Sequence, residues 1–420
     1  MIERQLKEWL EKVFARPQIV HILGLRQTGK TTLLNEFRKI IPNHLHYPLQ
    51  NYTILNKYRS NIEEWILEIE EALSRTNNNN TALHVFIDEI QKIPDLFQAL
   101  QGLYDNYKGR IKFWIWGSSA RPLKRRRAET LSGRVISRIL FPLSQNEIRK
   151  NDSLTAQLLN LPKVLKSISY SIPPDYITFL KKCFGQSLLP EPFLTRDKDA
   201  VYDLLDTYKA SYLENEIRRE NLVSDIGIFS RFLTIAASED TEVLNYNSVA
   251  KDLGISSHTV KTYHGILEDT FVTSQLTPYI NRMRMQVCKS SKVYFTDTGL
   301  ARFVSGQSNT PFMQTNAFGK CFEGFVINEI VKQVEYQSLR WKLSFFRTKN
   351  GREADLIISD GQKKCAVEIK AKKKITTSDF KNLKYMMEKD VSIAYGIVIS
   401  LQGVPIKLAA NIYNFPAWNL

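Results

Sequence analysis

The stretch QIVHILGLRQTGKTTLLNEF occupies residues 18–37 and decides the fold of the first third of the chain. A short apolar run, Ile19–Leu23, precedes G-L-R-Q-T-G-K-T at residues 24–31, and an amphipathic segment follows up to Ile40. This order predicts a strand, a glycine-rich phosphate-binding loop and a helix. Glycines let backbone N–H groups curl around phosphate oxygens, and the N-terminus of the helix adds positive potential.

The loop is predicted to bind ATP together with Mg²⁺. Lys30 is expected to reach the β- and γ-phosphates, and the hydroxyl of Thr31 is expected to bind Mg²⁺. The predicted nucleotide contacts in this segment are Gly24, Gln27, Thr28, Gly29, Lys30, Thr31 and Thr32. A chance match in a long chain is the alternative, and the strand and helix that flank the loop argue against it.

Two later apolar runs end in polar residues that suit the same site. ALHVFIDEIQKIPD, residues 82–95, predicts a buried strand that ends in Asp88 and Glu89. Asp88 fits a carboxylate that holds Mg²⁺, and Glu89 fits the base that orients the attacking water. IKFWIWGSS, residues 111–119, ends in Ser118 and Ser119, and one of these hydroxyls is expected to contact the γ-phosphate or the attacking water, with Ser118 as the candidate. A serine after a strand is also ordinary turn chemistry.

Strands and helices alternate through residues 1–150, the predicted ATPase domain. The predicted strands are 19–23, 45–49, 82–88, 111–116 and 135–141. This alternation is typical of a parallel sheet wound with helices, so the overall fold class is α/β. The loop at the end of one strand and the acids at the end of another are expected to meet at one edge of the sheet.

Several arginines and lysines follow the last of these apolar runs. Arg134 and Arg138 are candidates for an arginine finger that reaches the ATP of a neighbouring subunit, and Arg134 is taken as the nucleotide contact. The basic run Lys124–Arg127 is a candidate for contacting DNA. A solvated basic helix is an equally good interpretation of any single one of these residues.

Residues 151–310 are predicted to be a helical region that contains a winged helix over about residues 241–300. LNYNSVAKDLGISSHTVKTYHGILEDTFV, residues 244–272, has helix-turn-helix spacing with Gly254 in the turn, and a hairpin is expected after it. The expected DNA-facing residues are Ser257, His258, Lys261 and Thr262 on the second helix, with Arg282 and Arg284 at the hairpin tip. Such segments also serve as protein–protein modules. The spacing of His258 and His264 favours surface or packing roles over metal binding.

Residues 311–420 are predicted to form a restriction-endonuclease-like α/β domain. The order is a helix over 318–334, strands over 343–347, 353–358 and 364–369, a helix over about 377–387, and strands over 392–399 and 409–413.

Four side chains in this domain suit a Mg²⁺-dependent nuclease. Glu368 and Lys370 are two apart on one strand and project from the same face, and Asp355 is on the preceding strand. Asp355 and Glu368 are the predicted metal ligands, Lys370 steadies charge at the reacting phosphate, and Glu323 on the helix completes the set. Glu353 is expected to support Asp355. The alternatives are a solvated hairpin face and an inert nuclease-like fold.

These motifs together resemble the AAA-type ATPases of bacteria and archaea that carry a C-terminal domain of unknown function 4143. The resemblance rests on GLRQTGKTTLL, VFIDEIQ, WGSSA, LSGRVISRILFPLS, FEGFVINEI and the pair GREADLI and VEIK. It covers most of the chain, and residues 151–192 carry no matching motif. It implies a P-loop ATPase, a winged helix and a PD-(D/E)XK nuclease-like domain, in a family of poorly defined function.

Composition agrees with a partner of opposite charge. The net charge of +15 and the pI of about 9.4 favour nucleic acid, because neutralised phosphates release condensed counterions. Four scattered cysteines predict a reducing cytoplasm and no zinc site. We therefore expect a cytoplasmic, oligomeric ATPase that processes DNA with a Mg²⁺-dependent nuclease. The rival hypotheses are an ATP-switched regulator with an inert nuclease-like domain, and an ATPase whose basic surface binds RNA or an acidic protein.

Overall fold

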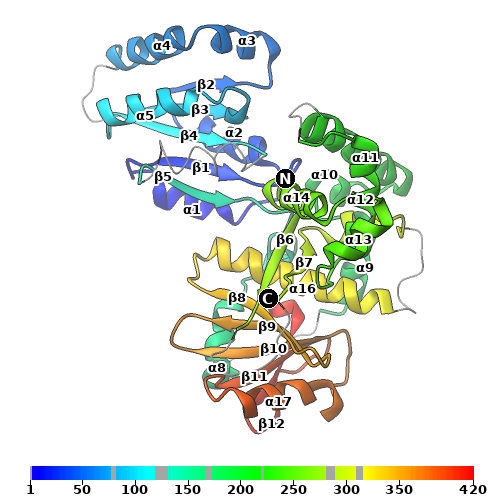
Figure 1. Ribbon diagram of the computed structural model, residues 1–420. Helices are drawn as coiled ribbons and strands as arrows, with labels where there is room; N and C mark the ends of the chain where they lie inside the picture. Colours follow the sequence, from blue (N-terminus) through cyan, green and yellow to red (C-terminus); the bar gives the residue numbers. More distant parts are fainter. Residues whose placement is uncertain are drawn as a thin grey trace. The chain divides into compact units, whose positions relative to one another are not determined.

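A computed structural model describes residues 2–76, 82–118, 131, 133–165, 173–218, 222–280, 289–308 and 316–420. The chain forms two compact units, residues 1–142 with 269–271, and residues 143–268 with 272–420 (Figure 1). The predicted DNA contacts Lys124–Arg127, Arg282 and Arg284 lie outside the described residues. Each unit is described by itself below.

The first unit is built on a five-stranded sheet in the order β2-β3-β4-β1-β5. The strands are β1 Ile19–Leu23, β2 His44–Pro48, β3 Leu83–Asp88, β4 Ile111–Trp116 and β5 Val135–Ile139, and every neighbouring pair is parallel. The three central strands are buried along their whole length, as expected for strands covered on both faces. The predicted parallel sheet is confirmed.

Helices separate these strands along the chain and complete the core of the first unit. They are α1 Leu6–Val13, α2 Lys30–Lys39, α3 Tyr52–Ser60, α4 Ile62–Ser74 and α5 Leu96–Asn106. Trp65 and Ile69 of α4 and Phe97 of α5 are buried against apolar residues of the sheet. The loops at the carboxyl ends of β1 and β3 are thereby held on a rigid support.

The second unit begins with helices and a helix–turn–helix–hairpin segment. The elements are α7 Gln145–Arg149, α8 Leu161–Val164, α9 Tyr176–Gln186, α10 Pro190–Leu194, α11 Lys198–Tyr212, α12 Ile226–Ser238, α13 Tyr246–Leu253, α14 Ser257–Asp269, β6 Thr273–Pro278, β7 Lys292–Phe295 and α15 Thr298–Val304. Gly254 ends α13 with a φ of 68°, which glycine adopts without strain. The predicted helix, turn, helix and hairpin are therefore present.

The second helix of this segment separates a buried face from an exposed one. Val260, Tyr263 and Leu267 are buried, whereas the predicted recognition residues Ser257, His258, Lys261 and Thr262 are all exposed. The exposed set has the solvent access that a binding role requires.

The side chain of His264 makes this segment sensitive to acid. It is 1% exposed, packs against Phe232 and Tyr246, and has no hydrogen-bond partner on either ring nitrogen. Burial lowers its pKa to about 4 from the ordinary 6.5. In the unfolded chain this histidine is protonated below pH 6.5, whereas in the folded chain it stays neutral down to about pH 4. The second unit therefore loses stability as the pH falls from 6.5 to about 4.

Replacing His264 by phenylalanine is expected to remove this part of the pH dependence. The wild-type contribution is about 3 kcal/mol between pH 6.5 and pH 4, at roughly 1.4 kcal/mol for each pH unit. Urea unfolding at several pH values gives the free energy of unfolding of each protein, and the slopes of this free energy against pH are then compared. Equal slopes would contradict the assignment, and replacing the exposed His258 by phenylalanine serves as the control.

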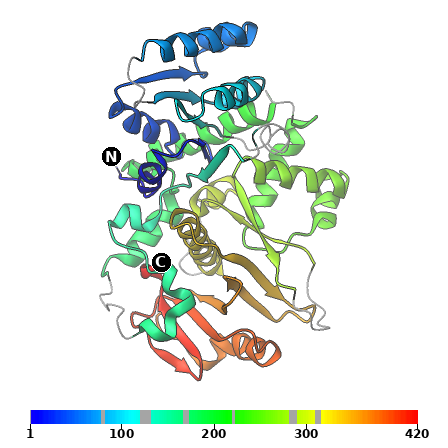
Figure 2. The ribbon, with the colours of Figure 1, turned by 90° about the vertical axis from the view of Figure 1, so that its left-hand side faces the viewer.

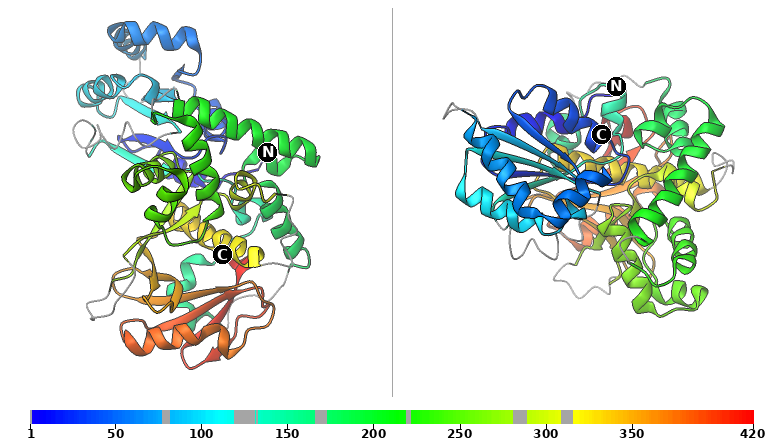
Figure 3. Two further views of the ribbon diagram at one scale, coloured as in Figure 1. Left: turned by 45° about the vertical axis from the view of Figure 1, so that its right-hand side comes forward. Right: turned by 90° about the horizontal axis from the view of Figure 1, so that it is seen from above.

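The C-terminal elements form an eight-stranded sheet together with the hairpin, in the order β12-β13-β11-β10-β9-β8-β6-β7. They are α16 Asn316–Tyr336, β8 Lys342–Arg347, β9 Glu353–Ser359, β10 Lys364–Lys370, α17 Lys381–Lys389, β11 Tyr395–Ser400, β12 Lys407–Ala409 and β13 Ile412–Pro416. Strands β10 to β13 are coloured orange to red in Figure 2, the hairpin strands β6 and β7 are yellow-green, and Figure 3 shows α16 in yellow beside the sheet. The predicted helix, three strands, helix and strand are present in that order, and two strands, β12 and β13, lie where one closing strand was predicted.

One pairing joins the hairpin to this sheet. Strand β6 is antiparallel to β7 and parallel to β8, with Thr277 opposite Ser344 and Pro278 opposite Phe345. The predicted division between residues 310 and 311 consequently falls inside one compact unit.

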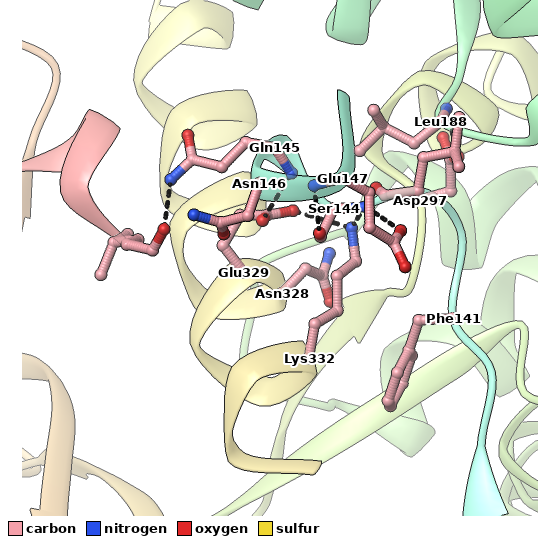
Figure 4. A network of polar contacts seen from close by, with 12 residues as sticks. Phe141, Ser144, Gln145, Asn146, Glu147, Leu188, Asp297, Asn328, Glu329 and Lys332 are labelled. Carbon is pink, nitrogen blue, oxygen red and sulfur yellow. Dashed lines mark hydrogen bonds and ion pairs between the residues drawn. The ribbon is translucent and has the colours of Figure 1, made fainter. Parts of the chain in front are cut away.

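A buried ion pair on α16 anchors the start of the second unit. Lys332 is 1% exposed and its Nζ donates to Glu329 Oε1 at 2.8 Å and to the carbonyl of Leu143 at 2.9 Å. Glu329 is fully buried, and its Oε2 accepts the backbone N–H of Gln145 at 2.9 Å (Figure 4). The side chain of Gln145 in turn donates to the carbonyls of Ala417 and Leu420. The network ties residues 143–145 to α16 and to the C-terminus of the chain.

Candidate functional site

The loop between β1 and α2 has a shape that only glycine allows at two positions. Gly24 has a φ of 146°, and a Cβ there would lie 2.2 Å from the carbonyl oxygen of Leu140. Gly29 has a φ of 89° and stands directly before the first residue of α2. Gly24 is therefore required by backbone geometry and by close approach, and Gly29 by backbone geometry.

The side chains of the loop divide into those turned inward and those left open. Lys30 Nζ donates to the carbonyls of Gly24 and Leu25 at 2.8 Å each, and Thr28 Oγ1 donates to Leu25 at 2.9 Å. Thr32 is exposed on the first turn of α2, and Gln27 adopts a left-handed φ of 59°. The lysine thus lies folded over the loop that it is predicted to serve.

The predicted Mg²⁺ ligands meet across the sheet. Thr31 Oγ1 donates to Asp88 Oδ2 at 3.0 Å, and Gln50 Nε2 donates to the same oxygen at 3.1 Å. Asp88 Oδ1 is buried and accepts no hydrogen bond. Burial, together with the neighbouring charge of Glu89, raises the pKa of Asp88 to about 6. An unpartnered carboxylate oxygen beside a hydroxyl suits a hard cation, so these residues fit Mg²⁺.

Glu89 is positioned next to these ligands by strained backbone and by hydrogen bonds. Its φ is 54° at the end of β3, in the left-handed region. Ser118 Oγ donates to Glu89 Oε2 at 3.2 Å, and Gln91 Nε2 donates to the same oxygen. Ser118 therefore contacts the predicted base, and Gln91 is a residue that the sequence motifs did not reveal.

Arg4 is a second residue that sequence motifs missed. It is buried before α1, its Nη1 donates to the carbonyl of Thr28 and its Nη2 donates to the carbonyl of Phe141 at 2.7 Å. One guanidinium thus joins the phosphate-binding loop to the segment that follows β5. No periodicity marks this role, because Arg4 lies outside the loop motif.

Replacing Arg4 by leucine is expected to weaken ATP binding by tenfold or more, since hydrogen bonds from a charged donor contribute about 1.5–3 kcal/mol. The loop would lose the donor that fixes Thr28. Isothermal titration with ATP measures the change. The matched control is Lys7→Met, which breaks only an exposed pair with Glu3 and is expected to have no effect. Unchanged affinity in the Arg4 variant would show that the loop holds its shape without the guanidinium.

The two candidate arginine fingers are engaged inside the first unit. Arg134 Nε and Nη2 donate to the carboxylate of Asp105 at 2.7 and 2.9 Å. The guanidinium of Arg138 lies 5.0 Å from the centre of the Trp9 ring. An intermolecular role for Arg134 requires it to leave Asp105, and that role stays a prediction.

The predicted nuclease residues of the second unit lie in one cluster. Lys370 Nζ is 2.7 Å from Glu368 Oε1, which confirms that the two side chains share a face of β10. Asp355 on β9 accepts the backbone N–H of Ile369 at 2.6 Å, and its charge acts on both Glu323 and Glu368. Burial first, and Asp355 next, raises the pKa of Glu368 to about 8 and that of Glu323 to about 7.

Strand β7 contributes two side chains to this cluster that sequence spacing did not predict. Lys292 Nζ is 2.7 Å from Glu323 Oε1 and 2.6 Å from Glu353 Oε1. Tyr294 donates its hydroxyl to Glu323 Oε1 at 2.9 Å. Burial opposes the charge of Lys292, but Glu323, Asp355 and Glu353 outweigh burial and raise its pKa.

Three of the four acids in this cluster are paired with lysines. Within the described parts of the chain, no three or more His, Cys, Asp or Glu residues are placed to hold a metal ion. Glu323 and Glu353 are both bound to Lys292, and Glu368 is paired with Lys370. Among the carboxylate oxygens of these four acids, only Glu368 Oε2 is buried without a hydrogen bond. The assignment of Asp355 and Glu368 as metal ligands stays a prediction.

Three parts of the chain match known protein families. Residues 16–149 match the family described as an AAA domain, residues 155–310 match a domain of unknown function, DUF8612, and residues 318–420 match another, DUF4143. The first and last matches agree with the architecture that the sequence motifs implied. In the described residues, no helix is both long and apolar enough to cross a membrane.

Several proteins are similar to this chain over most of its length. An uncharacterised protein of Mycobacterium tuberculosis is 25% identical over 369 residues, which are 86% of this chain and 72% of that protein. An uncharacterised protein of Haemophilus influenzae is 23% identical over 300 residues, 69% of this chain and 70% of that protein. A Walker-type ATPase of Pyrococcus abyssi aligns with a TM-score of 0.44 and 15% identity, covering 72% of this chain and 96% of that structure.

Proposed function

We propose that the first unit binds and hydrolyses ATP. The observation that carries the proposal is the hydrogen bond of 3.0 Å between Thr31 and Asp88, with Lys30 at the start of α2 and Glu89 directly after β3. Three parallel strands, β1, β3 and β4, bring these groups to one edge of the sheet. That edge is where open α/β sheets bind their ligands.

Each residue then has a role set by its chemistry. The backbone N–H groups of residues 24–31 bind phosphate oxygens, and Lys30 leaves the carbonyls of Gly24 and Leu25 to contact the outer phosphates. Thr31 and Asp88 would hold Mg²⁺, which would supply positive charge beside the phosphates. Glu89 orients the attacking water, while Ser118 and Gln91 keep its carboxylate in place.

Phosphate release from ATP by the purified protein tests this proposal. The wild-type protein is expected to turn over ATP only with Mg²⁺, and Lys30→Met is expected to show no turnover above background. Lys39→Met is the control, because Lys39 is an exposed residue of the same helix, paired with Glu36 at 2.6 Å. Equal turnover by the wild type and the Lys30 variant would refute the proposal.

We propose that the second unit binds DNA. We also propose that the protein acts as an oligomer. The net charge of +15 and the exposed set Ser257, His258, Lys261 and Thr262 support this partner. A salt titration of duplex binding is expected to give a steep slope, because several phosphate contacts release several counterions. A shallow slope, or equal binding by Lys261→Ala, would favour an acidic protein as the partner.

Phosphodiester cleavage by the C-terminal cluster is a second candidate, favoured by the convergence of Asp355, Glu368 and Lys370. The lysine pairs on three of the four acids support the rival hypothesis, in which ATP switches a binding activity and the nuclease-like domain is inert. Nicking of plasmid DNA by the wild type, Asp355→Ala and Lys370→Ala separates the two. Products that appear only with the wild type support cleavage, and their absence from all three proteins supports the inert domain.

A further inference from the structure

Lys292 occupies an unusual place in the C-terminal cluster. It is the first residue of β7, its side chain is 4% exposed, and its Nζ lies within 2.7 Å of two separate carboxylates. One of these, Glu323, comes from α16, and the other, Glu353, comes from β9. A buried ammonium between two acids of different elements has the position and the charge of a bound cation.

Two further contacts fix the acids around this ammonium. Tyr294, two residues along the same face of β7, donates to the glutamate oxygen that Lys292 also contacts. Arg347 Nη1 lies 3.5 Å from Glu353 Oε2. The two acids are therefore satisfied by protein donors, while Glu368 Oε2 has no donor. The carboxylates next to Lys292 therefore have donors, whereas one oxygen of Glu368 has none.

We propose that Lys292 is the resident cation of this cluster and determines which cation the cluster holds, by excluding a divalent ion from the position between Glu323 and Glu353. The inference rests on the proposed C-terminal site and is independent of ATP hydrolysis. Two carboxylates that share one ammonium cannot turn their oxygens toward Mg²⁺ or Mn²⁺ without losing both ion pairs. Because divalent-ion affinity follows the number and charge of free oxygen ligands, the lysine holds that affinity low.

Titration with Mn²⁺ of the full chain without nucleotide tests the proposal. All proteins carry Asp88→Asn, which removes the ATP-site carboxylate from the measurement. Lys292→Met, which keeps the side-chain length and loses the charge, is expected to bind one Mn²⁺ at least roughly tenfold more tightly than its parent, since two carboxylates lose the cation that they share. Adding Glu323→Gln to Lys292→Met is expected to reverse that gain.

The matched control is Lys320→Met, which removes a lysine of α16 paired with the single acid Glu242 at the surface. It is expected to leave Mn²⁺ binding unchanged. Equal affinity of Lys292→Met and its parent, with both proteins melting cooperatively, would overturn the proposal. So would a gain that Glu323→Gln leaves untouched.

A second comparison does not depend on the folding of the lysine variant. If Lys292 excludes the ion, Glu323→Gln alone leaves Mn²⁺ binding by the parent protein unchanged. Binding by the parent that Glu323→Gln abolishes would show a divalent ion in the presence of the lysine and would overturn the proposal. ATP turnover of Lys292→Met with Asp88 intact reports separately on the first unit.

Discussion

Replacing Glu89 by glutamine is expected to lower ATP turnover by about 10²–10⁴-fold, the usual contribution of a general base, while ATP binding persists. Glutamine keeps the size of the side chain but cannot accept a proton from water. Its amide oxygen can still accept from Ser118, as Glu89 Oε2 does at 3.2 Å. The expected loss therefore falls on the chemical step and spares the local structure.

Single-turnover hydrolysis and ATP titration on the same preparation separate these effects. Ser118→Ala is the control, because it removes one donor to Glu89 and leaves the carboxylate itself. Its turnover is expected to fall by less than that of the Glu89 variant. Turnover by Glu89→Gln within a few-fold of the wild type would assign the role of base to another residue.

Replacing Lys332 by methionine is expected to destabilise the second unit by about 3–5 kcal/mol, because the change leaves a buried carboxylate without its cation. Glu329 cannot be solvated when this partner is lost, because the residue is fully buried and its Oε1 is paired with Lys332 at 2.8 Å. The carbonyl of Leu143 also loses its donor. The melting temperature of the second unit is expected to fall by on the order of 10 °C.

A double variant distinguishes charge from packing in this test. Glu329→Gln with Lys332→Met removes both charges and keeps an acceptor for the N–H of Gln145, so it is expected to recover most of the lost stability. Lys39→Met, which breaks an exposed pair, is expected to cost less than about 1 kcal/mol. Calorimetric melting measures all three. A loss as small for Lys332→Met as for Lys39→Met would contradict the account.

Local sequence signals were sufficient to predict the candidate ATP site, because each of its segments is short and continuous in the sequence. The conformation of the loop of residues 24–31 is determined by glycines within the loop itself. The apolar run before Asp88 indicates the strand that ends in this acid. The contacts of Arg4 and Gln91 depend on how distant segments pack, and no spacing in the chain encodes them. Likewise, the sequence does not predict that Arg134 pairs with Asp105, because only the fold brings these two residues together.

The C-terminal cluster shows the same limit more strongly. The alternation of residues along β10 placed Glu368 and Lys370 on one face, and the element order brought Asp355 and Glu323 near them. The sequence assigns the hairpin to a separate predicted domain, so it gives no reason to place Lys292 in this cluster. The pairing of β6 with β8 moves that lysine into the site, and pairing between strands distant in sequence has no local signature.

The same pairing bears on how the chain can be divided. A fragment beginning at Asn316 would keep every strand from β8 to β13 but would lose the neighbour that covers the outer side of β8. Unpaired backbone groups along that strand would then be free to recruit another polypeptide, and the fragment would tend to aggregate. The two segments thus complete one sheet, and a fragment that held either one alone would expose the edge at which they pair.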